Sequence, residues 1–201
     1  MKNWKLILAI LTANVVLMAA GYTMLIPFLP MYLINELGVS AEDVKMWNGA
    51  IFSITFLIGG IMAPIWGKMA DTRGKKMMAV RAGAGLALSY FLGGIVTTPE
   101  QMFGVRVLQG FAAGLWSACL AIATSLVPME KLGVSLGIMQ AGLTCGNVIG
   151  PLVGGSLATL FGMRASFFVA GGLLTIITLV FMFYIPEPPK AEPKKLAAKP
   201  Q

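Results

Sequence analysis

Long apolar stretches separated by short polar segments dominate the pattern of this chain. Six such stretches can be drawn, over residues 6–32, 46–66, 77–96, 102–127, 132–160 and 165–185. A helix needs about 20 apolar residues to cross a bilayer, and a buried core helix seldom carries an apolar run of that length. An open sheet would leave backbone groups unpaired in lipid. Each stretch is therefore predicted to be a transmembrane helix.

The first stretch and the end of the chain carry helix-breaking residues. Gly21, Pro27 and Pro30 are expected to interrupt the first helix, because proline removes an amide donor and clashes with the preceding turn. Residues 186–201 are rich in proline, lysine and alanine and lack an apolar face. We predict a six-helix bundle over residues 1–185, followed over residues 186–201 by a flexible cytoplasmic tail or the start of a central linker.

The composition agrees with a membrane protein. Hydrophobic residues make up 57% of the chain and charged residues 11%, whereas soluble domains carry about 25% charged residues. A net charge of +7 would suggest nucleic acid as the partner of a soluble protein. Here the basic residues lie mostly between the apolar stretches, so we expect a lipid bilayer as the partner and no nucleic acid.

The positions of the charges predict the orientation in the membrane. Basic residues gather at the amino terminus, after the second stretch, after the fourth stretch and in the tail. With six crossings, all these segments lie on one side. The other side holds only Lys45 and Arg164, beside several acidic residues. Positive residues favour the cytoplasmic side, which predicts that both termini are cytoplasmic in the cell (inner) membrane.

The turns after the second and fifth stretches repeat each other. The repeated positions are Gly67, Ala70, Gly74 and Lys76 after the second stretch and Gly155, Ala158, Gly162 and Arg164 after the fifth. The first set falls on the predicted cytoplasmic side and the second set on the opposite side. Two similar three-helix units in opposite orientation form an inverted repeat, which is an arrangement typical of secondary transporters.

The predicted loop between the second and third stretches, residues 67–76, carries a candidate gate. Its glycines permit tight turns and close helix approach, and Asp71 can accept hydrogen bonds from Arg73 or from the end of a neighbouring helix. A basic loop that merely follows the charge bias would need neither Asp71 nor the glycines. We assign to conformational gating the residues Gly67, Asp71, Arg73, Gly74, Lys75 and Lys76.

Arg106 is the one charged residue well inside an apolar stretch. Such charges usually face a bundle interior or water, although an arginine near a helix end can also snorkel to the lipid headgroups. The small, weakly polar helix face that it occupies is expected to hold Gly110, Ala113 and Ser117 as well. Polar and aromatic side chains within the stretches form the candidate substrate or proton pathway: Asn14, Tyr22, Arg106, Gln109, Trp116 and Gln140.

Glycine recurs at every fourth position along much of the fifth stretch. The candidate helix-packing residues are Gly142, Gly146, Gly150, Pro151, Gly154 and Gly155. Such a row makes a flat groove that another helix can approach backbone to backbone, and the proline is expected to bend the helix. A groove this long needs a partner, and we expect part of it to face a second six-helix half.

Together these motifs resemble a known family. Residues 67–76 (GKMADTRGKK) match the major facilitator signature G-x-x-x-D-x-x-G-x-[RK], and residues 106–110 (RVLQG) resemble its fourth-helix R-x-x-Q-G motif. The glycine–proline pattern of the fifth stretch, which begins at Gly137, resembles the family's antiporter motif. Gly21, Pro27 and Pro30 resemble the first-helix motif of the twelve-span drug:proton antiporters. The resemblance covers residues 5–186.

The resemblance implies secondary active transport by the rocking of two six-helix halves. The transport expected here is proton-coupled efflux of small lipophilic, drug-like compounds. Neither a metal nor a cofactor is expected to take part. The chain matches the amino-terminal half, so a separate half, a second copy of this chain or a missing segment would complete it. Several relatives carry a first-helix carboxylate. This chain has Asn14 there and Glu36 only beyond the helix end, so proton coupling falls to other residues.

Two other functions remain open at this stage. A facilitator-type importer of a small solute would share the turn motif and Arg106, and a truncated, non-transporting membrane protein would share the length. No enzymatic activity is expected, because the sequence shows no catalytic carboxylate pair, no nucleophile with a base and no cofactor-binding loop.

Overall fold

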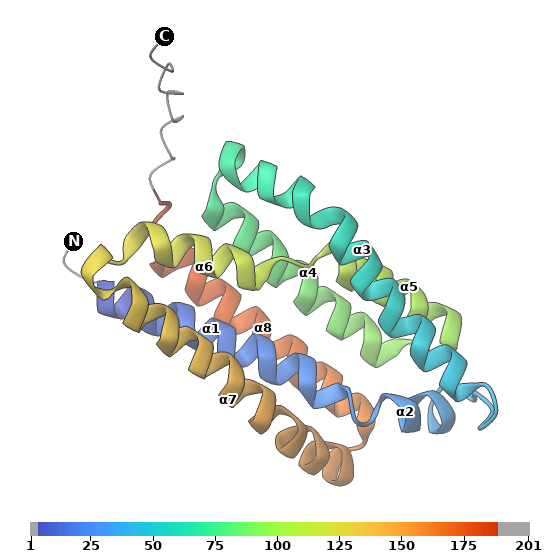
Figure 1. Ribbon diagram of the computed structural model, residues 1–201. Helices are drawn as coiled ribbons and strands as arrows, with labels where there is room; N and C mark the ends of the chain where they lie inside the picture. The colour runs from blue at the N-terminus through green and yellow to red at the C-terminus, as the bar shows by residue number, and fades with distance from the viewer. Residues whose placement is uncertain (1–3, 189–201) are drawn as a thin grey trace.

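A computed structural model describes residues 4–188, and within this range the chain is built from helices (Figure 1). They are α1 (Trp4–Leu25), α2 (Leu29–Asn35), α3 (Val44–Arg73), α4 (Lys75–Ile95), α5 (Pro99–Phe111), α6 (Leu115–Leu126), α7 (Met129–Phe161) and α8 (Met163–Tyr184). Six segments are long and apolar enough to cross a membrane, with α5 and α6 together forming one of them. The prediction of an all-helical membrane fold with six spans is confirmed. From residue 189 on, the predicted tail lies outside the described residues.

With six spans, the chain enters and leaves the bundle at the same end. Figure 1 shows the start of α1 and the end of α8 on one side, and the short α2 on the other. We call these the terminal end and the distal end of the bundle.

Two sharp turns at opposite ends of the bundle show the inverted repeat. α3 ends at Gly74, whose φ is 112° and whose amide donates to the Ala70 carbonyl at 3.1 Å. α7 ends at Gly162, whose φ is 84° and whose amide donates to the Ala158 carbonyl, also at 3.1 Å. The next helix begins at the following residue in each case. Positive φ is strained for residues that carry a side chain, so glycine makes both turns possible, and the predicted pair of inverted three-helix units is confirmed.

The segment over residues 67–76, predicted as a loop, is almost entirely helical. α3 continues through Gly67 and Asp71 to Arg73, α4 starts at Lys75, and Gly74 alone makes the turn. The expectation of a loop was wrong because one glycine with positive φ can redirect the chain while the helical hydrogen bonds on both sides are kept.

The first span breaks where its prolines lie. α1 ends at Leu25 and α2 begins at Leu29, so the break surrounds Pro27, and Pro30 lies in the first turn of α2. Proline is tolerated there because the first amides of a helix have no partner within it. Gly21 lies inside α1, so the expected interruption at this residue was wrong. Glycine lowers helix propensity but keeps its amide donor.

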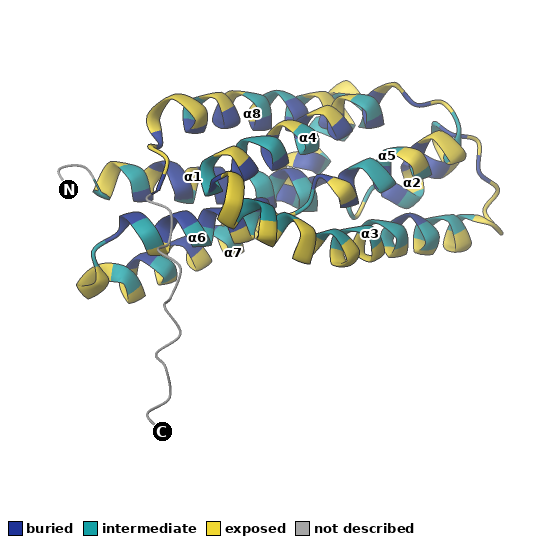
Figure 2. Ribbon diagram, turned by 90° about the horizontal axis from the view of Figure 1, so that it is seen from above, coloured by how far each residue is buried: buried dark blue, intermediate teal, exposed yellow. Residues whose placement is uncertain are grey.

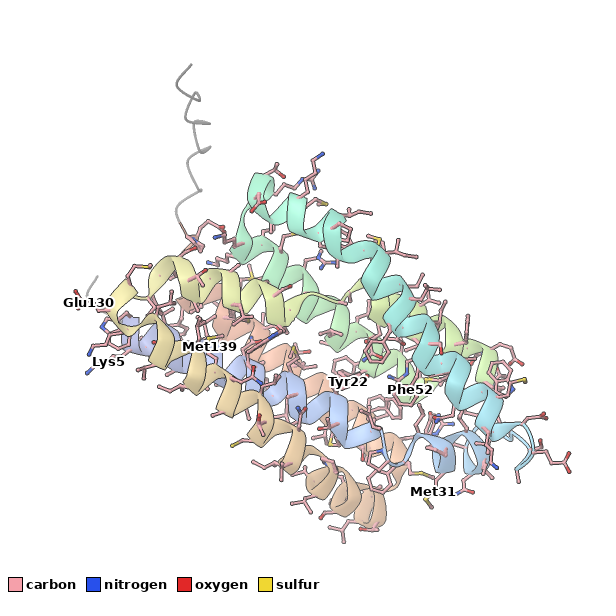
Figure 3. All side chains as sticks on the ribbon, in the orientation of Figure 1. Lys5, Tyr22, Met31, Phe52, Glu130 and Met139 are labelled. Atoms are coloured by element: carbon pink, nitrogen blue, oxygen red, sulfur yellow. The ribbon has the colours of Figure 1, made fainter. Side chains whose placement is uncertain are left out.

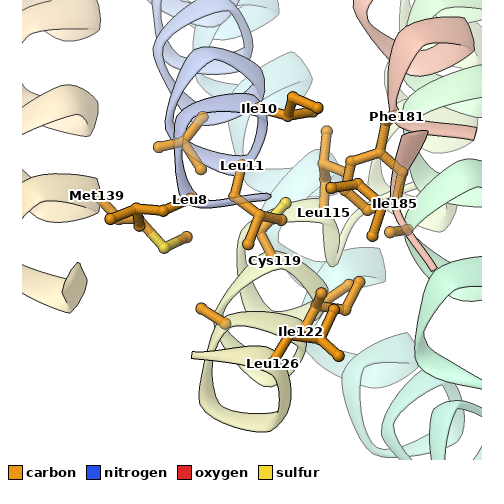
Figure 4. Packing of buried hydrophobic residues seen from close by; sticks show 14 of the residues in the cluster. Leu8, Ile10, Leu11, Leu115, Cys119, Ile122, Leu126, Met139, Phe181 and Ile185 are labelled. Atoms are coloured by element: carbon orange, nitrogen blue, oxygen red, sulfur yellow. The ribbon is translucent and has the colours of Figure 1, made fainter. Parts of the chain in front are cut away.

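Buried apolar side chains fill the space between the helices. One cluster lies where α1, α6, α7 and α8 meet, and Figure 4 shows Leu11, Cys119 and Phe181 within it. A second cluster includes Tyr32, which packs against the ring of Phe167 with the ring centroids 5.0 Å apart. These two clusters hold the six spans together as one bundle.

The outward-facing positions are apolar as well. Figure 2 shows exposed residues along the outer faces of the helices, and Phe56, Leu152 and Phe183 are 66%, 69% and 76% exposed. Exposed apolar surface over many helix turns would be unfavourable in water but suits the hydrocarbon of a bilayer. The surface therefore agrees with a multi-pass membrane protein.

The glycine groove of α7 is filled by α1. Its buried glycines are Gly142, Gly146, Gly150 and Gly154. A Cβ at Gly146 would lie 2.5 Å from the Val16 carbonyl oxygen, and one at Gly150 would lie 2.5 Å from the Ala20 carbonyl oxygen. The expectation that part of this groove faces a second half was wrong for these four glycines, because backbone-to-backbone packing within the same half already occupies their positions.

The remaining predicted packing residues of α7 lie beside this groove. The helix continues through Pro151, which is part-buried. A Cβ at Gly155 would lie 3.2 Å from the ring of Phe28, in the break between α1 and α2. The glycine–proline pattern therefore serves close packing against the first span along most of its length.

Candidate functional site

Arg106 places a charge in the interior of the bundle. The side chain, on α5, is only 4% exposed, and its Nη1 donates a hydrogen bond to Oε1 of Gln109 at 2.8 Å. Its guanidinium carbon lies 5.8 Å from the ring centroid of Phe52 on α3. Arg106 therefore points into the bundle and does not snorkel to the headgroups.

Tyrosines from α1 and α4 complete this arrangement. Tyr22 and Tyr90 lie in the neighbourhood of Arg106, and Figure 3 shows Tyr22 and Phe52 near the middle of the bundle. The interior polar cluster thus consists of Tyr22, Phe52, Tyr90, Arg106 and Gln109.

Arg106 has no carboxylate partner within residues 4–188. A buried charge without a counter-ion is costly in a membrane. Within the described part of the chain, neutral and aromatic groups alone offset this cost. The interior polar cluster is therefore a place where an acidic group or water from outside these six spans would be stabilised.

The fourth span breaks next to this cluster, although one continuous helix was predicted there. α5 ends at Phe111 and α6 begins after Gly114, whose φ is 108°. Arg81 on α4 donates from Nη1 to the Phe111 carbonyl and from Nη2 to the Ala113 carbonyl, each at 3.0 Å. Trp66 on α3 also donates to the Phe111 carbonyl at 3.0 Å. These donors satisfy carbonyls that the break leaves without helical partners.

Because of this break, the helix face predicted around Arg106 does not continue. Gly110 is buried, and a Cβ there would lie 2.6 Å from the Thr55 carbonyl oxygen, whereas Ser117 is exposed. The expectation of one common face was wrong because Gly114 redirects the helix. A signal for the break was present in the sequence, since Arg81, near the start of the third stretch, is a cation that needs hydrogen-bond acceptors at the membrane.

The predicted gating residues lie at the terminal end. Asp71 and Arg73 are exposed, and within residues 4–188 neither forms a hydrogen bond or ion pair through its side chain. The expected bond between them is therefore not formed in this part of the chain. Lys75 instead points inward, and its Nζ donates to Oγ of Ser125 at 2.8 Å and to the Ala121 carbonyl at 3.3 Å.

Glu187 caps α4 beside the same turn. The backbone amide of Lys76 donates to Oε1 of Glu187 at 3.3 Å, and a Cβ at Gly74 would lie 2.5 Å from the same oxygen. A carboxylate at a helix amino terminus is electrostatically favourable. Glu187 lies in the segment predicted as the tail, and this capping role was not predicted. The remaining predicted gating residue, Gly67, lies inside α3, and a Cβ there would meet no atom within 4 Å.

A second set of polar contacts closes the distal end. Nε of Arg164 lies 2.9 Å from Oε2 of Glu36, and Nη1 donates to the Gly94 carbonyl at 3.1 Å. The hydroxyl of Tyr32 donates to the Gly93 carbonyl at 2.9 Å. These contacts join the end of α2 to α4 and α8, and Arg164 and Glu36 are paired within the chain.

The family model described as Major Facilitator Superfamily matches residues 11–201. This chain belongs to the Major Facilitator Superfamily. The resemblance indicated by the turn motif and by the Arg106 motif is thereby confirmed.

Curated relatives show which part of a major facilitator protein the chain matches. It is 38% identical to the multidrug resistance protein MdtG of Proteus mirabilis, over 92% of this chain and 46% of the relative. It is 37% identical to the multi-drug resistance efflux pump PmrA homolog of Lactococcus lactis, over 98% of this chain and 49% of the relative. The chain therefore spans about half the length of these curated relatives.

Solved structures agree on the fold. The human organic anion transporter MFSD10 (TETRAN) matches with a TM-score of 0.79 and 18% identity, over 93% of this chain and 49% of that one. The nucleoside transporter NupG matches with a TM-score of 0.73 and 19% identity, over 96% of this chain and 48% of that one. At this identity the likeness shows the major facilitator fold alone.

The fold joins only some of the predicted pathway residues. Tyr22, Arg106 and Gln109 belong to the interior polar cluster. Asn14 is 1% exposed, and its Oδ1 has no hydrogen-bond partner among the described residues. Trp116 packs against the apolar cluster at the terminal end, and Gln140 is exposed on α7. Sequence reasoning missed Phe52 and Tyr90, which read as ordinary aromatic residues of apolar spans.

Proposed function

We propose that this chain is one six-helix half of a proton-coupled transporter that exports small lipophilic, drug-like compounds. The names of the curated relatives support the substrate class, and the inverted repeat supports alternating access. The observation that carries the proposal is the buried charge of Arg106, which has Gln109 as its side-chain partner in the described chain. Charges at this depth are retained mainly where they serve substrates or protons.

The proposal requires a second six-helix half. Alternating access needs two bundles that rock around a shared site, and this chain matches about half of each relative. A separate chain, a second copy or a further segment would supply it. In the complete transporter, an acidic group of the other half or of the substrate would offset the charge of Arg106, or water that enters the interior would solvate it.

Drug resistance tests the role of Arg106. In a host without its own efflux pumps, the complete transporter with Arg106→Ala should give no resistance. Arg106→Lys should also impair resistance, because lysine lacks the planar fork that holds two acceptors at once. Lys45→Ala, at an exposed lysine near the distal end, serves as the control. Full resistance with Arg106→Ala would contradict the proposal.

Reconstitution tests the need for a second half. The purified 201-residue chain is placed in vesicles with an imposed proton gradient, and substrate-dependent proton flux is measured with and without a second half. We expect flux only when both halves are present. Flux from a chain shown to be monomeric would overturn this part of the proposal.

We also propose that the terminal end is cytoplasmic in the inner membrane, because the basic residues gather there. The native Cys145 is exposed, so it is first replaced by serine. Single cysteines at the exposed positions Glu42 and Glu100 should then react with an impermeant thiol reagent from outside intact cells, and one at Lys68 should react only after permeabilisation. Labelling of the Lys68 position in intact cells would refute this orientation.

A further inference from the structure

A groove of about 800 Å³ lies between α1 and α7 at the terminal end. Its walls are apolar and include Leu8, Ala9 and Ala13 from α1 and Val134 and Ile138 from α7. None of the residues of the interior polar cluster lines it. The transport function proposed above therefore leaves this groove without a role.

The groove opens on an apolar face of α7. Val134 and Ile138 are exposed and four residues apart, so they share one face of the helix. The exposed polar residues Gln140, Thr144 and Asn147 share a different face. A polar face suits water or a protein partner, whereas an apolar face suits hydrocarbon. Lipid is therefore the neighbour that the chemistry of this groove favours.

The rim of the groove is basic and carries an interfacial aromatic residue. Lys5 and Lys131 line the groove at the terminal end beside Trp4, and Nζ of Lys5 lies 6.0 Å from the centroid of the Trp4 ring. Neither lysine forms an ion pair within residues 4–188. Glu130 is the acidic neighbour of Lys131, and Figure 3 shows it at the same end as Lys5. One carboxylate against two ammonium groups leaves the rim positive.

We propose that this groove binds one anionic phospholipid from the leaflet at the terminal end. An acyl chain lies along α1 and α7, and the phosphate binds between Lys5 and Lys131. Trp4 lies at the level of the headgroup, where tryptophan is enriched in membrane proteins. Both α1 and α7 begin at this end, so the positive ends of their helix dipoles also favour the phosphate. Basic pockets between transmembrane helices are known to select acidic headgroups.

The site goes beyond the proposed transport function and does not depend on it. The assignment to the cytoplasmic leaflet does rest on the proposed orientation. Lipid binding measured on the purified chain does not depend on which side of the membrane the terminal end faces. It can therefore fail or succeed independently of the labelling and transport experiments.

Native mass spectrometry of the purified chain tests the headgroup contact. The chain is titrated with phosphatidylglycerol or with phosphatidylcholine of the same acyl composition. We expect about a tenfold preference for phosphatidylglycerol, as two lysines at a headgroup would produce. The preference should disappear in the double variant K5Q/K131Q and persist in K45Q, which removes an exposed lysine far from the groove. Equal binding of both lipids by the unmodified chain, or an unchanged preference in K5Q/K131Q, would overturn the proposal.

A groove-filling variant tests the acyl-chain contact. Ala13 is exposed and lines the groove, so Ala13→Phe should lower binding of both lipids without removing the lysines. Retained binding in a variant that elutes as a folded monomer would mean that the headgroup binds to a basic surface alone, which would overturn the groove as the site.

A photo-crosslinking residue at Ile138 identifies the occupant without relying on a destabilising change. Irradiation in vesicles that contain phosphatidylglycerol should add the mass of one phospholipid to the chain. A crosslink to a second protein chain at this position would identify a helix as the occupant and would likewise overturn the proposal.

Discussion

The turn between α3 and α4 and the turn between α7 and α8 have the same backbone but different surroundings. Each is made by one glycine with positive φ, and each glycine amide donates to the carbonyl four residues earlier. At the distal turn, Arg164 pairs with Glu36 of the same chain. At the terminal turn, Asp71 and Arg73 project outward, and their side chains have no partner within residues 4–188.

The distal turn is thus tied to other helices of the same chain, whereas the terminal turn leaves two charged side chains without a partner among the described residues. An inverted repeat supplies two equivalent turns, and the distal one uses its charges to tie α2, α4 and α8 together. At the terminal one, Lys75 bonds within the chain, but Asp71 and Arg73 have no side-chain partner among the described residues. We propose that Gly67, Asp71, Arg73, Gly74, Lys75 and Lys76 gate the transport cycle there, because contacts that form in one state and break in another must join two bodies that move.

The helices that lead into the two turns differ as much as the turns do, and a bulky substitution should show this most strongly. Gly146→Leu on α7 would drive a side chain into the backbone of α1, whereas Gly60 on α3 has open space around it. We expect Gly146→Leu to cost more than about 3 kcal/mol and to prevent recovery of folded protein. Gly60→Leu should elute normally in fluorescence-detected size-exclusion chromatography. Normal elution of Gly146→Leu would contradict the close backbone packing of α7 against α1.

Removing the Asp71 carboxylate tests the gating role directly. In the complete transporter, Asp71→Asn should abolish turnover and leave substrate binding within a few-fold, because Asp71 lies at the membrane edge and away from the interior polar cluster. Glu100→Gln, an exposed acid at the distal end, should change neither quantity. Transport and equilibrium binding are measured on the same preparations, and a loss of binding as complete as the loss of transport would refute gating.

Alanine at the two turn glycines separates backbone strain from side-chain contact. Gly162→Ala meets open space but requires positive φ, so it should cost about 1–3 kcal/mol. Gly74→Ala carries the same strain and also displaces Glu187, so its melting temperature should be the lower of the two. Equal melting temperatures would show that the Glu187 contact contributes nothing, and a neutral Gly162→Ala would contradict the strained turn.

The smallest expected effect comes from the ion pair itself. The side chains of Arg164 and Glu36 are 33% and 32% exposed, and surface pairs contribute about 0–1 kcal/mol. Glu36→Gln should therefore lower the melting temperature slightly at low salt and less at high salt, because salt screens exposed charges. Arg73→Gln at the terminal turn should leave it unchanged. An equal loss in both variants would remove the contrast between the two ends.

Local pattern alone determined much of this protein. Apolar length predicted six spans, since a bilayer demands it wherever the helices pack. Pro27 predicted the break after α1, because the missing amide acts within one turn of the chain. The paired glycine motifs predicted the inverted turns, and the depth of Arg106 in its apolar stretch marked the residue that the fold buries in the interior polar cluster.

Tertiary structure decided which faces meet. The glycines of α7 are matched by α1 and not by a second half, and the break in the fourth span is stabilised by Arg81 and Trp66 from two other helices. Glu187 became a helix cap because the end of α8 lies beside the start of α4. Residue type and spacing describe one helix at a time, whereas these contacts depend on the rotation and crossing of several helices, and that arrangement is set only when all six spans pack together.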